Sequence, residues 1–406
     1  MVCAPVSTPT LRTSSETTRL LFAGVLATLL AMGWAASHFT ALMPALGAGK
    51  HLSAATLDLI FGVYAIGLLP GLLVGGRASD IFGRASVALV GSLTVLLGTV
   101  AMLPSQESGV LMVGRLIVGL GVGLAVSSCT SWASDLHGST GAALAGAVLM
   151  AGFAVGPFAS GAIASIAQSG VRLSFAVAAG LVAVAMIVAV GVSQRAAPVR
   201  PEPAPGSEAP GSHSRRLALG WAMPLAPWVF ASASVAFVTI PTKEHTGLAA
   251  PLAAGVAALI TNGASGVIQL VARSRRWGPQ TGTVGALLAA LGYAALAVAP
   301  SSMPLGLGLA LVVLLGCASG LCLREGLIDV EAAAPQQFRG TLTGIFYAVT
   351  YVGFGLPLLL TVLGPGPETA LIFAALAALA TTAALSRAVR LRRHPHRQHR
   401  VSPASA

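Results

Sequence analysis

The sequence predicts an all-α integral membrane protein with twelve transmembrane helices in two six-helix bundles. The first observation is composition: of 406 residues, 55% are hydrophobic and 9% are charged, whereas a soluble protein carries about 25% charged residues. The second is rhythm, because apolar runs recur at the length of about 20 residues that a spanning helix needs. The third is a polar, proline-rich segment that divides these runs into two sets.

The predicted spans fall into two sets of six. The first set is expected near residues 20–45, 54–75, 85–104, 109–131, 140–164 and 172–193. The second set is expected near residues 217–241, 249–272, 281–300, 304–323, 339–362 and 368–388. Prolines, glycines and charges between the sets predict a flexible linker. The expected organisation is therefore a leader (1–19), a first bundle (20–193), a linker (194–216), a second bundle (217–388) and a basic tail (389–406).

The basic residues predict an orientation. If both termini are cytoplasmic, the cytoplasmic side carries all Lys and Arg except Lys50, Arg172 and Lys243 on the other side and Arg115 within a span. This asymmetry satisfies the positive-inside rule, so we expect a multi-pass protein of the cell inner (plasma) membrane. The net charge of +11 is then placed against anionic lipid headgroups. A nucleic-acid partner for the basic tail is the weaker interpretation.

The sequence offers no pattern for a cofactor or a metal. The four cysteines show no paired or metal-ligand spacing, and no P-loop for ATP is present. An enzyme would need His, Asp or Glu clustered at one depth, and the predicted spans offer only scattered candidates. A transporter of small molecules is therefore favoured over a polytopic membrane enzyme or a signalling scaffold.

A glycine-rich polar segment lies between the second and third spans. Gly76-x3-Asp80-x2-Gly83-Arg84 resembles the loop signature of the major facilitator superfamily, although Ile81 and Ala85 stand where that family usually has basic residues. Glycines permit the backbone angles of a tight turn, and the arginine can anchor the turn at the headgroups. The segment is interpreted either as a simple topological hairpin or, as the resemblance implies, as a gate that latches the two halves.

Two further motifs support the resemblance. Arg115-Leu116-Ile117-Val118-Gly119 in span four is similar to the family's arginine motif. In span five, Gly152-x3-Gly156-Pro157-x2-Ser160-Gly161 resembles the Gly-Pro motif of the family's drug–proton antiporters. Such stripes of small residues also serve close helix packing alone. The resemblance implies proton-coupled efflux of small organic molecules by alternating access, with uptake or facilitated transport of a sugar or metabolite as the alternative.

Three ionisable residues are expected inside the membrane, where charge is expensive and usually functional. His38, Asp58 and Arg115 all fall in the same half of the first bundle. We expect Asp58 or His38 to carry the coupling proton and Arg115 to influence it, because a nearby cation favours a carboxylate and disfavours an imidazolium. The competing interpretations are a helix-dipole role for Asp58, packing for His38 and snorkelling for Arg115.

The candidate substrate residues share helical faces. Trp34 lies four residues before His38, Tyr347 and Tyr351 are four apart, and Asn262 and Gln269 are seven apart. Aromatic rings with a few amides suit a bulky, partly apolar, neutral or cationic ligand. Ordinary packing or interfacial positions explain each pair equally well.

Overall fold

The computed structural model describes residues 10–166, 169–193, 215–244, 246–300, 302–333, 339–364 and 366–393. These residues contain no strand, and they form 12 helical segments long and apolar enough to cross a membrane. The fold class predicted from the sequence is confirmed. Of the sequence-defined linker and tail, residues 194–214 and 394–406 lie outside the described part.

The first bundle holds six spans built from six helices. Its first span is broken at His38, which separates α1 from α2, and the long α5 contains two spans joined at His137 and Gly138. Gly138 has φ +57 there, a conformation that glycine adopts without strain. The helices are α1 (Thr10–Ser37), α2 (Phe39–Lys50), α3 (Ala54–Phe82), α4 (Arg84–Ala101), α5 (Ser108–Ile166) and α6 (Gly170–Ser193).

The second bundle also holds six spans, two of which are interrupted. Its first span is assembled from α7 (Arg215–Ala222), α8 (Ala226–Ser234), the π-helical η1 (Val235–Thr239) and the 3-10 turn η2 (Ile240–Lys243). Its fifth span is assembled from α12 (Arg339–Val352), the 3-10 turn η4 (Gly353–Gly355) and α13 (Leu356–Leu363). The unbroken spans are α9 (Ala250–Ser274), α10 (Thr281–Val298), α11 (Leu305–Ala333) and α14 (Pro367–Arg393).

Three helices extend beyond their predicted ends. Helix α3 continues to Phe82, so the expected ten-residue polar loop is wrong and only Gly83, with φ +90, separates α3 from α4. Helix α11 runs to Ala333 rather than residue 323, and α1 begins at Thr10, inside the predicted leader. In each case the helix includes polar residues that lie beyond its apolar stretch.

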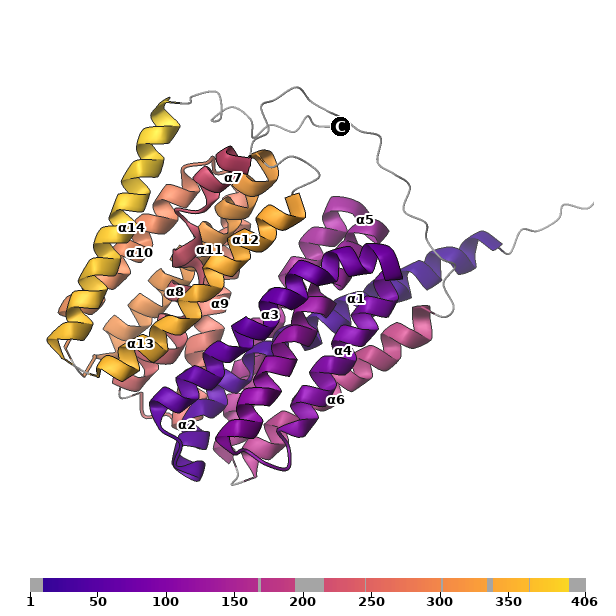
Figure 1. The fold of residues 1–406 in the computed structure, drawn as a ribbon, viewed down its shortest axis with the longest axis horizontal. Coiled ribbons are helices and arrows are strands. Elements are labelled where there is room, and N and C mark those ends of the chain that lie inside the picture. Colours follow the sequence, from indigo (N-terminus) through magenta and orange to yellow (C-terminus); the bar gives the residue numbers. More distant parts are fainter. Residues whose placement is uncertain are drawn as a thin grey trace, which may run out of the picture.

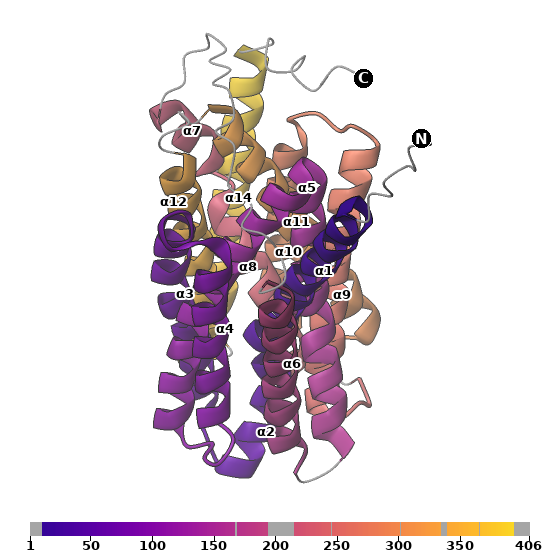
Figure 2. The ribbon, with the colours of Figure 1, turned by 90° about the vertical axis from the view of Figure 1, so that its right-hand side faces the viewer.

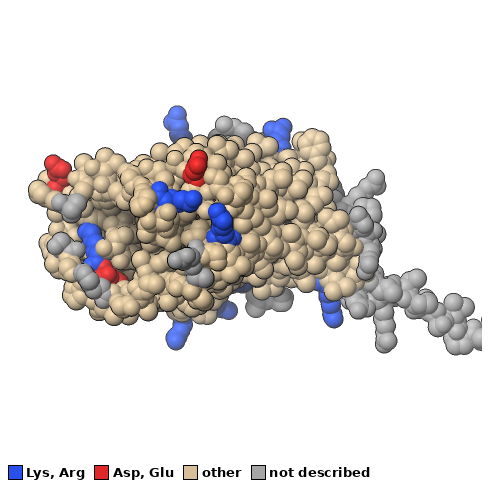
Figure 3. Space-filling view, turned by 90° about the horizontal axis from the view of Figure 1, so that it is seen from below, with Lys and Arg blue, Asp and Glu red and all other residues tan. Residues whose placement is uncertain are grey.

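The two bundles stand side by side with their helices roughly parallel (Figures 1 and 2). Helix α2 lies at one end of the molecule, whereas α7 begins and α14 ends at the other (Figure 1). We call these the α2 end and the basic end, because Arg84, Arg216 and Arg390 belong to the latter. Seen from below, the α2 end is largely uncharged, with separated charged side chains (Figure 3).

Glycine faces allow helices α3 and α5 to touch through their backbones. A Cβ atom at Gly67 or Gly71 would overlap the carbonyl oxygen of Leu116 or Leu120, and one at Gly119 would overlap that of Tyr64. In lipid there is no hydrophobic driving force between helices, so association depends on close van der Waals packing, which small residues permit. The close packing expected from the small-residue stripes is therefore confirmed for this pair.

The bundles meet along two seams. Helix α9 contacts both α5 and α2, and α3 contacts both α12 and α13. Away from the seams, helices such as α6 and α14 expose leucine, isoleucine and valine, including Ile187 and Leu371. That surface suits a lipid environment, and the seams enclose the candidate site described next.

Candidate substrate and proton site

A cavity of about 50 Å³ lies between the two bundles. The first bundle lines it with residues of α1, α2, α3 and α5, and the second with residues of α8, η1, α9, α11 and η4. Apolar and aromatic side chains form most of the wall. The lining residues used below are Ser37, Thr40, Phe61, Tyr64, Arg115, Phe230, Phe237, Asn262, Ser265, Ser319 and Phe354.

Arg115 places a positive charge in this wall. Its side chain is 1% exposed, its Nη1 donates a hydrogen bond to the carbonyl of Ala36 at 2.9 Å, and its guanidinium lies over the rings of Phe39 and Tyr64 at 5.0 and 4.5 Å. No described carboxylate forms an ion pair with it, and its Nε has no hydrogen-bond partner. Desolvating an ion costs several kcal/mol, and the two ring faces offset part of that cost.

His38 sits at the junction of α1 and α2 and is fully buried. Its Nδ1 lies 3.0 Å from the carbonyl oxygen of Ala35 and 3.3 Å from that of Trp34, so this nitrogen carries the proton and donates. The ring meets Phe175 edge-on at 5.3 Å, while Nε2 has no partner. The polar contacts of His38 are thus confined to its own helix and connect no two helices.

Asp58 bridges the two bundles. Its side chain is 4% exposed on α3, and Thr361 on α13 donates a hydrogen bond of 2.6 Å to its Oδ2. Both residues line a second cavity, of about 340 Å³, toward the α2 end. No ion pair joins Asp58 to Arg115 among the described residues. Asp58 lies at the seam and Arg115 lines the central cavity, whereas His38 lines neither of the two cavities.

Aromatic rings from both bundles separate the central cavity from the α2 end. Phe61 of α3 packs against Phe237 at 6.2 Å and Phe354 at 4.9 Å, and Phe354 packs against Phe230 at 4.8 Å. Phe237 and Thr40 line both the central cavity and the cavity that holds Asp58. Phe237 and Thr40 therefore stand between the two spaces, and Phe61, which packs on Phe237, lines the central one. The sequence analysis did not single out these phenylalanines, because nothing in their spacing distinguishes them from packing residues.

The five predicted substrate residues are not gathered in one place. Asn262 lines the central cavity and donates hydrogen bonds to the carbonyls of Ala258 at 2.9 Å and Phe153 at 3.4 Å. Tyr351 stacks on Phe230 at 4.5 Å, behind the cavity wall, and Tyr347 lies beyond it at 6.3 Å. Trp34 and Gln269 are outside the lining, where Gln269 donates to Ser265 at 3.4 Å. Of the five predicted residues, Asn262 alone is among the described residues that line this cavity, and a substrate role for the other four stays a prediction.

The Gly-Pro segment of α5 faces two partners. Gly152 and Gly156 pack on the α1 backbone, where added Cβ atoms would meet Gly33 and Trp34 at about 3 Å or closer. Gly161 and Pro157 instead face α9 of the other bundle. A Cβ at Gly161 would overlap the carbonyl of Pro251, and one at Gly255 would overlap that of Pro157. The segment thus forms a close backbone contact across the seam.

The predicted gate residues form a network inside the first bundle. Arg84 pairs with Asp80 at 2.5 Å and with Asp135 at 2.8 Å, and it donates to Ser79 at 2.7 Å. Gly76 and Asp80 lie within α3 rather than in a loop, while Gly83 supplies the turn. These contacts tie the end of α3 and the part of α5 just before its kink at His137 to the start of α4. None of the ion pairs of Arg84 crosses to the second bundle.

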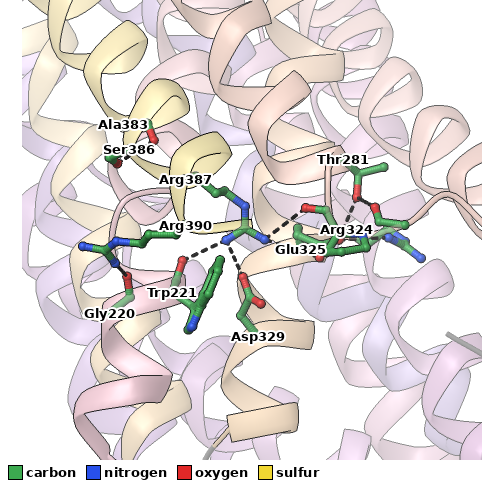
Figure 4. Close-up of polar contacts among 12 residues, drawn as sticks. Gly220, Trp221, Thr281, Arg324, Glu325, Asp329, Ala383, Ser386, Arg387 and Arg390 are labelled. Atoms are coloured by element: carbon green, nitrogen blue, oxygen red, sulfur yellow. Dashed lines mark hydrogen bonds and ion pairs between the residues drawn. The ribbon is translucent and has the colours of Figure 1, made fainter. Parts of the chain in front are cut away.

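A buried ion cluster near the basic end of the second bundle was missed by the sequence analysis (Figure 4). Arg387 of α14 is 1% exposed and pairs with Asp329 at 2.6 Å and Glu325 at 3.4 Å, both on α11. Thr281 donates to Glu325 at 2.7 Å, and Arg387 also donates to the carbonyl of Trp221 at 3.0 Å. The available signal was Arg324-Glu325-x3-Asp329 directly after an apolar span, with Arg387 ending another.

Both bundles join the start of their third span to the end of their fourth. In the first bundle Arg84 reaches Asp135, and in the second Thr281 reaches Glu325. Parallel repeats of this type are common in transporters built from two six-helix halves. Two six-helix halves with a central cavity between them are the architecture of a membrane transporter.

Comparison with known proteins identifies the family. The model of the Major Facilitator Superfamily matches residues 21–357, and the chain belongs to this superfamily of transporters. It is a transporter rather than an enzyme. The suspected family resemblance is confirmed.

Curated relatives match only a short part of the chain. Multidrug resistance protein MdtL of Salmonella typhimurium is 31% identical over 81 residues, which is 20% of each chain. Probable inositol transporter 2 of Arabidopsis thaliana is 35% identical over 78 residues, which is 19% of this chain and 13% of the relative. The matches therefore span a fifth or less of those proteins.

Solved structures share the fold across nearly the whole chain. A peptide transporter POT in complex with alafosfalin has a TM-score of 0.74 at 15% identity, covering 95% of this chain and 96% of that one. The inward-open xylose transporter XylE from E. coli has a TM-score of 0.70 at 15% identity, covering 91% and 95%. At these identities the likeness concerns the fold alone.

Proposed function

We propose that this transporter exports small organic molecules in exchange for protons, by alternating access of the central cavity to the two sides of the membrane. The observation that carries the proposal is the hydrogen bond from Thr361 to Asp58, a buried carboxylate at a seam that must open and close. A titratable group at such a seam links proton binding to the opening of the α2 end.

The basic end is proposed to face the cytoplasm, with both termini there and the protein in the cell inner membrane. The described basic residues Arg84, Arg273, Arg276 and Arg390 lie near the ends of helices at this end, consistent with the positive-inside rule. Residues 20–193 and 217–388 are proposed to move as two bodies joined by the segment 194–216. The α2 end then faces outward.

Proton coupling follows from the charge of Asp58. As a carboxylate, Asp58 accepts a charge-assisted hydrogen bond from Thr361, and such bonds are roughly twice as strong as neutral ones. Protonation removes that assistance and weakens the seam at the α2 end. Burial of Asp58 disfavours its charged form, whereas the hydrogen bond from Thr361 favours it. Opening or closing the seam changes both influences, and so it changes how tightly Asp58 holds its proton. His38 is a weaker candidate, because its polar contacts stay within its own helix.

Export is favoured by the Gly-Pro segment of α5. Its glycines and proline resemble the drug–proton antiporter motif, and here they contact α9 directly at the seam. The relative MdtL is named as a multidrug resistance protein. The mostly aromatic cavity wall also suits partly apolar compounds better than a sugar, which needs many hydrogen-bonding groups.

The proposal is tested with the purified chain in liposomes that contain a pH-sensitive dye. Cationic, neutral and anionic aromatic compounds are added one at a time at equal internal and external pH. A transported compound is expected to drive proton movement in the opposite direction. Transport of compounds without any proton movement would contradict proton coupling and would favour a uniporter, the alternative form of uptake or facilitated transport.

A further inference from the structure

The central cavity carries an unbalanced positive charge. Its described lining includes Arg115 but no aspartate and no glutamate. The ion pairs formed by the described residues all lie elsewhere, around Arg84 and Arg387. Arg387 is a second fully buried arginine, and its guanidinium is flanked by the carboxylates of Asp329 and Glu325. Arg115 has the same burial without a carboxylate.

Two hydrogen-bond donors in this wall lack acceptors. The Nε of Arg115 and the hydroxyl of Tyr64 are both buried and have no partner. The two side chains lie together, since the guanidinium carbon is 4.5 Å from the centroid of the Tyr64 ring, and both line the cavity. Buried donors are normally satisfied in proteins, so an unsatisfied pair facing a cavity indicates a missing acceptor.

We infer that the transported molecule is an organic anion with an aromatic or apolar body, whose oxyanion is held by Arg115 and Tyr64. This inference rests on the proposed export function and names the substrate class of the same cavity. A carboxylate, sulfonate or phosphonate oxygen accepts from the Nε of Arg115 and from the Tyr64 hydroxyl. Phe61, Phe230 and Phe354 offer ring surfaces for the body of the molecule.

The positive charge of Arg115 indicates a narrower class of substrate than the spacing of aromatic residues in the sequence does. Aromatic rings alone suit neutral or cationic ligands, but a cation placed beside Arg115 would be repelled at low dielectric. Asp58 is the buried carboxylate that could have balanced this charge, but it lines the neighbouring cavity and already accepts a hydrogen bond from Thr361. An anion in the central cavity would instead complete both the charge and the hydrogen bonds of its wall.

A depression at the α2 end also carries positive charge. Its wall includes Lys50 and Arg172, and no Asp or Glu is among the described residues that line it. Its volume is about 880 Å³. Like charges around an exit raise the local concentration of counter-ions, so this depression is compatible with an anion that leaves at the α2 end.

The inference is tested by equilibrium binding to the full chain in detergent, with three probes that share one aromatic body. Isothermal titration calorimetry compares naphthylacetate, naphthylacetamide and naphthylethylamine. The acetate is expected to bind about tenfold or more tightly than the amide, because hydrogen bonds to a charged group are the stronger ones. The amine is expected to bind weakest.

Two variants assign the binding to this wall. Tyr64→Phe removes only a hydroxyl that has no partner, so the fold should be retained and naphthylacetate should bind about tenfold more weakly. Arg115→Lys keeps the charge but loses the planar donor group and should also weaken acetate binding. The matched control is Tyr293→Phe, whose hydroxyl contacts Ser232 at 3.2 Å in the second bundle, and it should bind as the parent chain does.

Several results would overturn the inference. These are an amide or amine that binds as tightly as the acetate, no binding of any probe by the folded chain, or acetate binding that both variants leave unchanged. Because binding is measured without a membrane, its outcome is independent of transport. Selective acetate binding with no proton movement in liposomes would retain the anion site and contradict proton coupling. Proton movement driven by cations, with no binding of naphthylacetate, would support proton coupling and contradict the anion site.

Discussion

Thr361 donates a 2.6 Å hydrogen bond to Asp58 and so joins α13 of the second bundle to α3 of the first. Both residues line the cavity toward the α2 end, which Phe237 separates from the central cavity. The bond therefore places a buried carboxylate at the contact between the two bundles, where the proposed proton coupling requires one.

Removal of the Thr361 hydroxyl should loosen the α2 end. Hydrogen bonds to charged groups contribute about 1.5–3 kcal/mol, so Thr361→Val should shift the closed-to-open ratio about tenfold or more toward open. Spin labels at Gly49 of α2 and at Leu248, just before α9, lie in different bundles at the α2 end. Pulsed electron paramagnetic resonance should report a longer distance between them in Thr361→Val. Thr361→Ser keeps the hydroxyl and serves as the control. Unchanged distances in Thr361→Val would contradict a role in closure.

A side chain at Gly255 should prevent the α5–α9 contact from closing. Its Cβ would overlap the carbonyl of Pro157, whereas a Cβ at Gly266 on the same helix meets nothing within 4 Å. Gly255→Leu should therefore expose a cysteine placed at Ser37 to a membrane-impermeant maleimide added from the α2 side. Gly266→Leu should leave that cysteine protected. Equal labelling of both variants would show that this contact does not control access.

Loss of Arg387 should destabilise the second bundle strongly. Arg387→Leu leaves Glu325 and Asp329 buried without their counter-ion, and breaking a buried pair in this way costs about 3–5 kcal/mol. Thermal unfolding in detergent should show a clearly lower midpoint. Replacing all three residues with leucine should recover much of the loss, because the unpaired charges are gone.

The matched control for this cluster is Arg390→Leu. Arg390 is exposed, and its one hydrogen-bond partner among the described residues is the carbonyl of Gly220, so the unfolding midpoint should change little. A midpoint for Arg387→Leu that equals that of Arg390→Leu would contradict the buried-pair interpretation.

The cluster around Arg84 should contribute less. The side chains of Arg84, Asp135 and Asp80 are 20%, 28% and 63% exposed, and partly exposed ion pairs contribute about 1 kcal/mol or less. Asp135→Asn should lower the unfolding midpoint slightly, and Asp80→Asn should lower it less. The difference should shrink in high salt, since salt screens exposed charges. A larger effect from Asp80→Asn would indicate a role for Asp80 beyond this network.

The fold could be predicted from the sequence because a lipid bilayer requires each spanning helix to have a certain length and an apolar composition. The number of spans, their grouping and the superfamily follow from apolar runs, the polar segment after span six and three short motifs. The ends of the helices were harder to predict. Hydropathy falls after Leu323 and after Gly75, but backbone hydrogen bonding carries α11 to Ala333 and α3 to Phe82.

The site was only partly accessible, because burial and pairing depend on residues that are distant in sequence. Asp58 and Arg115 were identified by their charge within a span, yet the partner of Asp58 lies 303 residues away. Glu325 and Asp329 looked like loop residues, since nothing local reveals that Arg387 folds against them. Phe61, Phe237 and Phe354 gained significance only when the two bundles brought their rings together.

The most direct test of proton-coupled export compares the parent chain with Asp58→Asn in liposomes loaded at acidic internal pH. The compound identified by the binding series is supplied outside, and its accumulation is measured with and without a protonophore. The parent chain should accumulate the compound as protons leave, and the protonophore should abolish this accumulation. Asp58→Asn should still exchange labelled for unlabelled compound but should not concentrate it. Accumulation by Asp58→Asn equal to that of the parent chain would contradict the assignment of the coupling proton to this carboxylate.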